Sequence, residues 1–316
     1  MDTIRKVITK PGEVIDFETV FEENTRIRTG VPKKRGHCER LDYETAVYED
    51  GKTYRKYCYI YLPYGYDPEN KDKKYNVLYF QHGNTCDPQI FGVGGNMPMI
   101  DMLFDSGEIE PCILAFITYY MDPEGDYKDR VVTGMVPAGD GAWPGIKGNY
   151  YREIVEDIIP LVETKYNTYL TDPSREGIQA TRDHRGFCGY SRGCGCTWNI
   201  IRRDFPYFRW YAPMSGHISA GRPRGETPTE QEVLDFLTEG MKANPELPFF
   251  IYASCGNPDA ESMKAQMKFI TKAEGFSFGK DPEKNNIYFA VSDFYHTDFL
   301  VPYYLWNSMK VLFKGV

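Results

Sequence analysis

Apolar and polar positions alternate near the start of the chain and then give way to continuous apolar runs. Residues 39–48 and 53–62 alternate and are rich in tyrosine, and Asp50-Gly51 lies between them, which predicts a β-hairpin. The later runs have strand length without alternation, as expected of parallel strands buried on both faces. These runs cover residues 76–80, 112–118, 207–215, 248–254 and 287–291.

Segments with apolar residues three or four positions apart separate these runs and predict helices. They cover residues 97–105, 150–166 (despite Pro160), 194–205, 229–243, 260–273 and 300–313. Strands that alternate with helices indicate an α/β fold with a mostly parallel central sheet and helices on both faces. Because we find no internal repeat and no break in composition, we expect residues 38–316 to form a single domain. The polar, irregular residues 1–37 are interpreted as an N-terminal extension packed on it.

The stretch that carries the chemistry is Arg185 to Trp198, which contains Gly189-Tyr190-Ser191-Arg192-Gly193. This matches G-x-S-x-G, in which a serine sits on a sharp turn between a strand and a helix with its hydroxyl exposed. A short apolar run precedes the motif and the predicted helix follows it. This context favours a nucleophilic serine over a glycine-rich turn that happens to contain one.

A serine hydroxyl needs a base to take its proton and a carboxylate to orient that base. In hydrolases with this turn the order along the chain is serine, acid, histidine. Of the five histidines, three precede Ser191, and His217 follows it too soon for an acid to intervene. His296, between the last strand and the last helix, is therefore the predicted base.

The acid should lie in a loop that follows a strand, between the serine and the histidine. Asp259 follows the strand at 248–254 and meets this requirement. Asp293 and Asp298 are rivals that lie close to His296 in sequence, whereas Asp235 and Glu239 fall in a predicted helix. We favour Asp259.

The oxyanion formed during ester hydrolysis needs hydrogen-bond donors. One is the backbone N–H that follows the nucleophile, here that of Arg192, at the positive end of a helix. The second comes from the loop after an early strand, and His82-Gly83-Asn84-Thr85 is in this place. We predict the N–H of Asn84, although His82-Gly83 is also compatible with a plain strand-end turn.

Composition narrows the classes of partner. A net charge of −8 argues against binding to nucleic acid. No apolar run approaches the length of a membrane span. The first residues show no secretion signal, so the chain as written is expected to be cytoplasmic, or else the mature or excised form of a secreted enzyme.

Three cysteines crowd the serine, but their spacing is unlike common zinc sites, and small buried thiols are the favoured interpretation. No metal or cofactor is expected.

Several motifs in fixed order resemble the esterase D-like α/β-hydrolases, in particular the feruloyl and acetylxylan esterases of carbohydrate esterase family 1. The resemblance spans residues 38–313 and includes Tyr-Ile-Tyr-Leu-Pro-Tyr-Gly-Tyr-Asp at 59–67, Tyr-Asn-Val-Leu-Tyr-Phe-Gln-His-Gly at 75–83, the serine turn, Cys-Gly-Asn-Pro-Asp at 255–259, and His296. It implies an α/β-hydrolase fold, a triad of Ser191, Asp259 and His296, and an oxyanion hole formed by the amides of Asn84 and Arg192. The family often has a glycine-rich run where this chain has Asn84-Thr85-Cys86, and often methionine in place of Arg192.

The resemblance implies a serine esterase that acts on feruloyl (hydroxycinnamoyl) esters of plant arabinoxylan. Acetylxylan, siderophore lactones and S-formylglutathione are alternative substrates, and a non-catalytic binding module is the alternative from another class. Trp143, Tyr120 and Tyr295 are candidates to pack a phenolic ring, although ordinary packing explains each equally well. Trp143 belongs to a Gly/Pro-rich loop at 121–148, whose length is typical of functional loops. The oligomeric state is left open.

Overall fold

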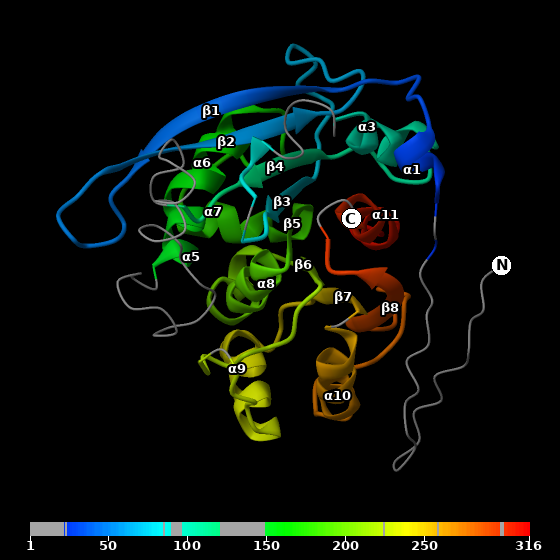
Figure 1. The fold of residues 1–316 in the computed structure, drawn as a ribbon. Coiled ribbons are helices and arrows are strands. Elements are labelled where there is room, and N and C mark those ends of the chain that lie inside the picture. Colours follow the sequence, from blue (N-terminus) through cyan, green and yellow to red (C-terminus); the bar gives the residue numbers. More distant parts are fainter. Residues whose placement is uncertain are drawn as a thin grey trace.

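The computed structural model describes residues 22, 24–84, 86–89, 97–120, 149–223, 225–257, 259–297 and 300–316. Within them a sheet of eight strands has the order β1-β2-β4-β3-β5-β6-β7-β8 (Figure 1). The strands are β1 (His37–Thr45), β2 (Tyr54–Leu62), β3 (Val77–Gln81), β4 (Ile113–Ile117), β5 (Arg185–Tyr190), β6 (Trp210–Met214), β7 (Phe250–Asn257) and β8 (Ile287–Tyr295). β1 and β2 pair antiparallel, as predicted for a hairpin, and β3 to β8 are all parallel.

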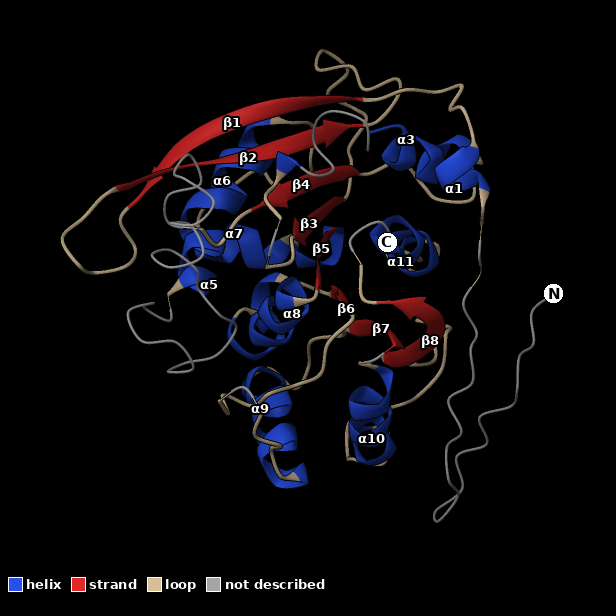
Figure 2. Ribbon diagram, viewed as in Figure 1, coloured by secondary structure: helices blue, strands red, loops and turns tan. Residues whose placement is uncertain are grey.

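Helices cover both faces of the sheet, as predicted (Figure 2). They are α1 (Arg26–Thr29), α3 (Met97–Asp105), α5 (Tyr150–Glu153), α6 (Ile159–Lys165), α7 (Arg175–Ala180), α8 (Arg192–Arg203), α9 (Glu230–Ala243), α10 (Ala260–Ile270) and α11 (Val301–Met309). Buried side chains of α1, α3 and α11 share one apolar core with the sheet. Those of α5 to α10 form the core on the opposite face. α7 was not predicted; at six residues it is too short for a periodic pattern.

The helix predicted over 150–166 has the expected extent but not a regular interior. α5 and α6 are joined by a π-helical turn, Ile154–Ile158. Pro160 has no N–H to donate to the carbonyl four residues earlier, so a regular α-helix would leave that carbonyl unpaired. A wider turn just before the proline accommodates the loss.

A buried ion pair links β2 to the start of this interrupted helix. Nζ of Lys56 lies 2.7 Å from Oε1 of Glu153, and both side chains are fully buried. The hydroxyl of Tyr43 donates to the same carboxylate at 2.6 Å, and that of Tyr48 donates to its other oxygen. Burial lowers the pKa of Lys56, and the Glu153 carboxylate opposes this shift. The hairpin is therefore fastened to α5 by charge as well as by apolar contact.

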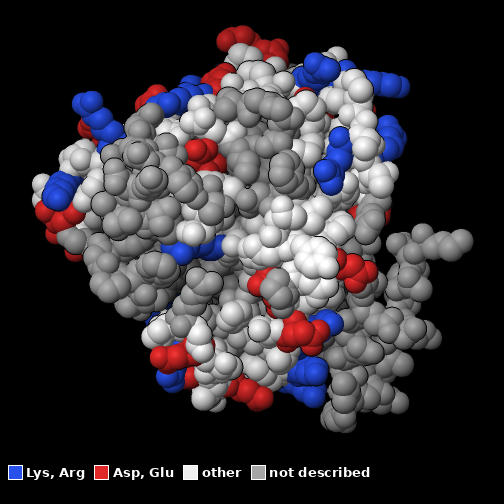
Figure 3. Space-filling model, viewed as in Figure 1, with Lys and Arg blue, Asp and Glu red and all other residues white. Residues whose placement is uncertain are grey.

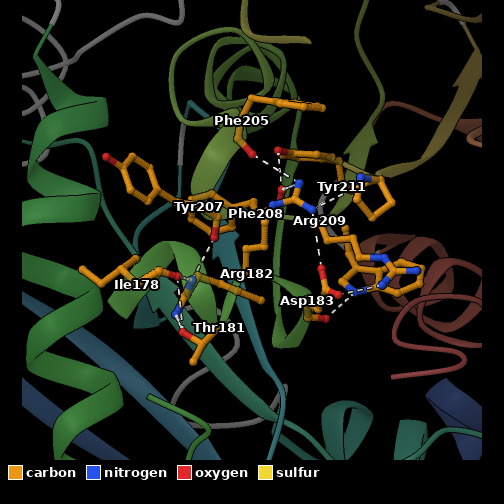
Figure 4. A network of polar contacts seen from close by, with 12 residues as sticks. Ile178, Thr181, Arg182, Asp183, Phe205, Tyr207, Phe208, Arg209 and Tyr211 are labelled. Atoms are coloured by element: carbon orange, nitrogen blue, oxygen red, sulfur yellow. Dashed lines mark hydrogen bonds and ion pairs between the residues drawn. The ribbon is translucent and has the colours of Figure 1, made fainter. Parts of the chain in front are cut away.

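A second polar network ties together the amino ends of the central strands (Figure 4). Arg182 donates to the carbonyl oxygens of Pro248 and Phe205 at 2.7 and 3.3 Å. Asp183 accepts from Arg209 at 3.0 Å. The two Arg182 bonds satisfy carbonyls in the segments that lead into β6 and β7. They lie at the opposite edge of the sheet from the loops that follow β5 and β7.

β1 forms one edge of the sheet and carries charged side chains on its outer face. Arg40 lies 2.6 Å from Asp42, and Glu44 lies 3.1 Å from Arg55 of β2. On the face shown in Figure 3 acidic and basic side chains are interspersed across the described surface. In the described part of the chain, no helix combines the length and the apolar character needed to cross a bilayer.

The proposed boundary between residues 1–37 and 38–316 lies close to the start of β1. Part of the preceding segment contacts α3 and α11. The backbone amides of Lys33 and Lys34 donate to Asp105, and that of Glu22 donates to Asn307. Residues 1–21 lie outside the described residues, so for them the packed extension stays a prediction.

Candidate active site

Ser191 occupies a sharp turn between β5 and α8. Its φ of 58° and ψ of −114° are unusual for a residue with a side chain. Such a backbone costs on the order of 1–3 kcal/mol and persists where the surroundings enforce it. Here the amide of Ser191 donates to the carbonyl of Met214 at 2.9 Å, and its own carbonyl accepts from Cys194 at 3.0 Å. The motif therefore has the strand–turn–helix context that the sequence predicts.

The two glycines of the motif are required by close backbone approach. A Cβ at Gly189 would lie 2.3 Å from the carbonyl oxygen of Gly193. A Cβ at Gly193 would lie 2.1 Å from the carbonyl oxygen of Gln81, at the end of β3. No real Cβ fits at either distance. Glycine at both positions lets α8 start directly against β3 and β5.

The structure brings Ser191, His296 and Asp259 into one hydrogen-bonded series. Nε2 of His296 lies 2.8 Å from Oγ of Ser191, and Nδ1 lies 2.6 Å from Oδ2 of Asp259. Ser191 follows β5, Asp259 follows β7, and His296 follows β8, so all three lie at the carboxyl edge of the sheet. The histidine ring also packs against Tyr190, with ring centroids 5.0 Å apart.

This geometry fixes which histidine nitrogen carries the proton. A carboxylate is an acceptor only, so Nδ1 must donate to Asp259. In the neutral ring Nε2 is then the acceptor, and it faces the Ser191 hydroxyl. The side chain of His296 is 36% exposed and that of Asp259 is 23% exposed, so the histidine can be reached from solvent. The arrangement can take a proton from the serine and return it to a leaving group.

The loop after β3, which contains Asn84, is held by aromatic side chains. Tyr119 donates to the Gly83 carbonyl at 2.8 Å, and Tyr120 donates to the Asn84 carbonyl. Nδ1 of His82 lies 2.7 Å from the Gly83 carbonyl and must donate to it, so Nε2 accepts from Thr118 at 2.8 Å. His82 and Tyr119 were not predicted as part of the site. His82 stands directly before Gly83 and Asn84 in the sequence, and this position is the signal that could have identified it.

Arg192, the other residue proposed for the oxyanion hole, opens α8. The contact between Gly193 and the end of β3 brings this helix start beside the His82 to Asn84 segment. The first N–H groups of a helix point out of its amino end, where the helix dipole favours negative charge. Both proposed amides thus belong to backbone segments that meet at one edge of the sheet.

The three aromatic candidates for a substrate pocket differ in placement. Tyr295 ends β8 beside His296 and is 76% exposed. Tyr120 has no exposed surface, and its hydroxyl is bonded to the Asn84 carbonyl, which differs from the expectation that it presents a ring to substrate. Its contact with the loop is structural, and direct contact with a substrate stays a prediction. Trp143 lies outside the described residues.

The thiols near the serine are buried and unpaired with one another. Cys188, Cys194 and Cys196 are at most 3% exposed, and all eight cysteines are free. Burial raises the pKa of each of these three thiols, which keeps them protonated. This confirms the prediction of small buried thiols. Among the described residues no group of three or more histidine, cysteine, aspartate or glutamate side chains is arranged to hold a metal ion.

Ser215 is a site residue that the sequence did not single out. It follows β6 directly, is 1% exposed, and has a φ of 55°. Its hydroxyl donates to Oδ2 of Asp259 at 2.9 Å and lies 3.5 Å from Nδ1 of His296.

No family model matches the chain. Over 246 residues, 74% of this chain, it is 30% identical to endo-1,4-beta-xylanase Y of Acetivibrio thermocellus, covering 19% of that protein. Over 224 residues, 68% of this chain, it is 25% identical to an endo-1,4-beta-xylanase/feruloyl esterase of Xylanibacter ruminicola, covering 25% of it. The chain thus spans a quarter or less of these curated relatives.

A solved structure shares the fold over nearly the whole chain. It is the S954A mutant of the feruloyl esterase module from Clostridium thermocellum, complexed with sinapinate. The TM-score is 0.75 at 23% identity, and the alignment covers 98% of both chains. The fold prediction is thereby confirmed. The chain thus has the α/β-hydrolase fold and is similar over nearly its whole length to solved feruloyl esterase structures.

Proposed function

We propose that this chain is a serine esterase that hydrolyses feruloyl (hydroxycinnamoyl) esters on plant cell-wall arabinoxylan. The observation that carries the proposal is the series of hydrogen bonds from Ser191 through His296 to Asp259. It is the arrangement that nucleophilic catalysis by a serine requires: a nucleophile, a base in contact with it, and a carboxylate that orients the base.

The first half of the reaction forms an acyl-enzyme. Nε2 of His296 takes the proton of the Ser191 hydroxyl as Oγ attacks the ester carbonyl. The ring becomes an imidazolium, which the Asp259 carboxylate stabilises through the Nδ1–H bond of 2.6 Å. His296 then gives the proton from Nε2 to the departing alcohol, and the acyl group remains on Ser191.

The tetrahedral intermediate carries a negative charge on the former carbonyl oxygen. We assign the backbone N–H groups of Arg192 and Asn84 to that oxygen. Removing one such donor in serine hydrolases costs roughly 10²–10³ in kcat. Because both donors are backbone amides, the departure from the family pattern at these two side chains leaves this role intact.

The second half of the reaction returns the enzyme to its starting state. His296 takes a proton from water, the resulting hydroxide attacks the acyl carbonyl, and the carboxylic acid leaves as His296 returns the proton to Ser191. Each proton moves through Nε2 of one ring. The reaction therefore needs no group beyond the side chains and amides already named.

The substrate assignment rests on the relatives. One is a xylanase/feruloyl esterase, and the solved feruloyl esterase module has sinapinate bound, so a hydroxycinnamoyl ester attached to a polysaccharide is the ligand we propose. Tyr295, beside His296, and Trp143 are the proposed contacts for the phenolic ring. Neither nucleic acid nor a membrane is a proposed partner, and the net charge of −8 argues against the former.

A panel of substrates tests the assignment. Methyl ferulate and a feruloylated arabinoxylan oligosaccharide should be hydrolysed much faster than acetylated xylan or S-formylglutathione. Ser191→Ala should abolish turnover while leaving the unfolding temperature unchanged, and a serine-directed phosphonate should label Ser191 alone. Turnover of acetyl esters without methyl ferulate would overturn the feruloyl assignment. Unchanged activity in Ser191→Ala would overturn the mechanism.

A further inference from the structure

Behind the acid of the triad lies a chain of buried hydroxyl groups that the reaction does not use directly. It runs from Ser292 of β8 through Tyr304 of α11 to Ser215, which follows β6. The Tyr304 hydroxyl lies 3.1 Å from that of Ser292, and it also interacts with the Ser215 side chain. Ser215 bonds Asp259 at 2.9 Å. All three hydroxyl-bearing residues are at most 2% exposed.

We propose that Ser215 is a positioning residue, which holds the Asp259 carboxylate in the orientation that accepts the proton of His296, and that Tyr304 fixes Ser215 for this task. The inference rests on the proposed triad and adds to it the groups that keep its acid in place. Neither residue touches the ester, so both act through Asp259.

The contacts of the carboxylate support this role. Within the described chain, Ser215 and His296 are the two residues that bond the Asp259 side chain, and both bond the same oxygen, Oδ2. Asp259 also begins α10, but its side chain makes no capping bond to that helix. Ser215 therefore limits rotation of a carboxylate that the helix itself leaves unrestrained.

The direction of the hydrogen bonds follows from the carboxylate. Asp259 accepts only, so Ser215 gives its single proton to it, and the Ser215 oxygen is left as an acceptor toward the Tyr304 hydroxyl. Burial raises the pKa of Tyr304 to about 12, so its hydroxyl keeps the proton it donates. The series of hydroxyl groups thus donates a neutral hydrogen bond to Asp259 and brings no charge near it.

The backbone near these three hydroxyl groups has the conformation and the space that they need. Ser215 has a left-handed backbone with φ of 55°, and its amide donates to the carbonyl of Ser254 at 2.7 Å. A Cβ at Gly256 would lie 2.3 Å from the carbonyl oxygen of Phe294 and 2.8 Å from both the Tyr304 hydroxyl and Oγ of Ser292. Glycine at position 256 leaves room for the two hydroxyl groups. Non-glycine residues with a left-handed backbone, such as Ser215, are found mostly at functional sites.

Ser215→Gly and Tyr304→Phe test the proposal. Glycine accepts the left-handed backbone and removes the hydroxyl, while phenylalanine keeps the ring and removes one oxygen. We expect kcat on a chromogenic ester to fall about 10-fold in Ser215→Gly and about 3-fold in Tyr304→Phe, with KM unchanged. Ser254→Ala, which removes an equally buried serine hydroxyl from β7, and Ala220→Gly, which relieves another left-handed residue with φ of 52°, should keep full activity.

Two further readouts separate positioning from a merely structural role. Because Ser215 acts through Asp259, Ser215→Gly should change the rate of phosphonate labelling of Ser191 less than 2-fold when Asp259→Asn is already present. The low-field proton NMR signal of the His296 Nδ1–H should shift or broaden in Ser215→Gly and stay in place in Ser254→Ala. The proposal would be overturned if Ser215→Gly lowered the labelling rate equally with and without Asp259→Asn. It would also be overturned if the NMR signal of His296 did not change in Ser215→Gly.

These readouts do not depend on the feruloyl assignment. Phosphonate labelling and the NMR signal report on Ser191 and His296 whatever the ester. If methyl ferulate is not hydrolysed but these measurements behave as expected, the proposed substrate is wrong and the positioning role stands. If Ser191 is not labelled in the unmodified protein, the mechanism itself is wrong.

Discussion

Gly193, in the first turn of α8, lies against Gln81 at the end of β3, so close that a Cβ on the glycine would come within 2.1 Å of the Gln81 carbonyl oxygen. Since the other atom is backbone, it cannot rotate away. This contact sets the distance between the helix that follows Ser191 and the loop that contains Asn84.

Gly193→Ala should therefore damage both stability and catalysis. The helix start must move away from β3, which separates the two proposed oxyanion amides. We expect a loss of about 2–4 kcal/mol in the free energy of unfolding and at least 100-fold in kcat, measured by urea denaturation and ester hydrolysis. Gly186→Ala is the matched control in β5, because the nearest atom there is a methyl of Leu78, at 2.9 Å, which can turn aside. An active, stable Gly193→Ala would contradict the role of this contact.

Tyr120→Phe should lower kcat without weakening substrate binding. The change removes the hydrogen bond to the Asn84 carbonyl and leaves the ring in place, so the amide of Asn84 becomes less well aimed. We expect a loss of about 10-fold in kcat with KM unchanged. Tyr252→Phe is the control, since Tyr252 is equally buried and lies in β7 away from this loop. A raised KM with normal kcat would instead assign Tyr120 to substrate binding.

Asp204 should make stability depend on pH. Burial raises the pKa of this fully buried carboxyl well above 3.8. The unfolded chain then ionises at a lower pH than the folded one, so the folded state holds more protons and loses stability as the pH rises above about 4. Asp204→Asn removes this loss. Urea denaturation should show the variant to be more stable than the parent at pH 7, with the difference shrinking toward pH 4; a difference that is constant with pH would refute the assignment.

The buried pair of Lys56 and Glu153 should show strong coupling. Removing one partner leaves an unpaired buried charge, so Lys56→Met alone should cost about 3–5 kcal/mol of unfolding free energy. Lys56→Met combined with Glu153→Gln should cost less than Lys56→Met alone, because no charge is then stranded. Urea denaturation of the two single variants and the double variant gives the coupling energy. Additive losses would mean that the pair contributes little.

Much of the fold could be predicted because apolar runs and helical spacing report burial directly. Strand, helix and loop boundaries agree within a few residues for most elements, and α3 matches its predicted range of 97–105. The π-helical turn before Pro160 could not be foreseen, because its width depends on how the helix compensates for a missing donor. α7 begins with a Ser174 cap and ends after six residues, too soon for periodicity to reveal it.

The order of serine, acid and histidine along the chain was enough to select three residues that the structure brings within hydrogen-bonding distance. That rule works because parallel strands deliver their carboxyl ends to one edge. Ser215 could not be found in this way. A serine after a strand is common, and its contact with Asp259 depends on a left-handed backbone that the sequence does not specify.

The charged outer face of β1 has a consequence for behaviour at high concentration. An edge strand exposes unpaired backbone groups to which a second molecule could add a strand. On β1, however, such an addition would have to bury or displace Arg40, Asp42 and Glu44, and the first two form one ion pair of 2.6 Å. The β1 edge of the described sheet is thus protected against edge-to-edge pairing between molecules. Neutralising these three side chains should promote fibril formation.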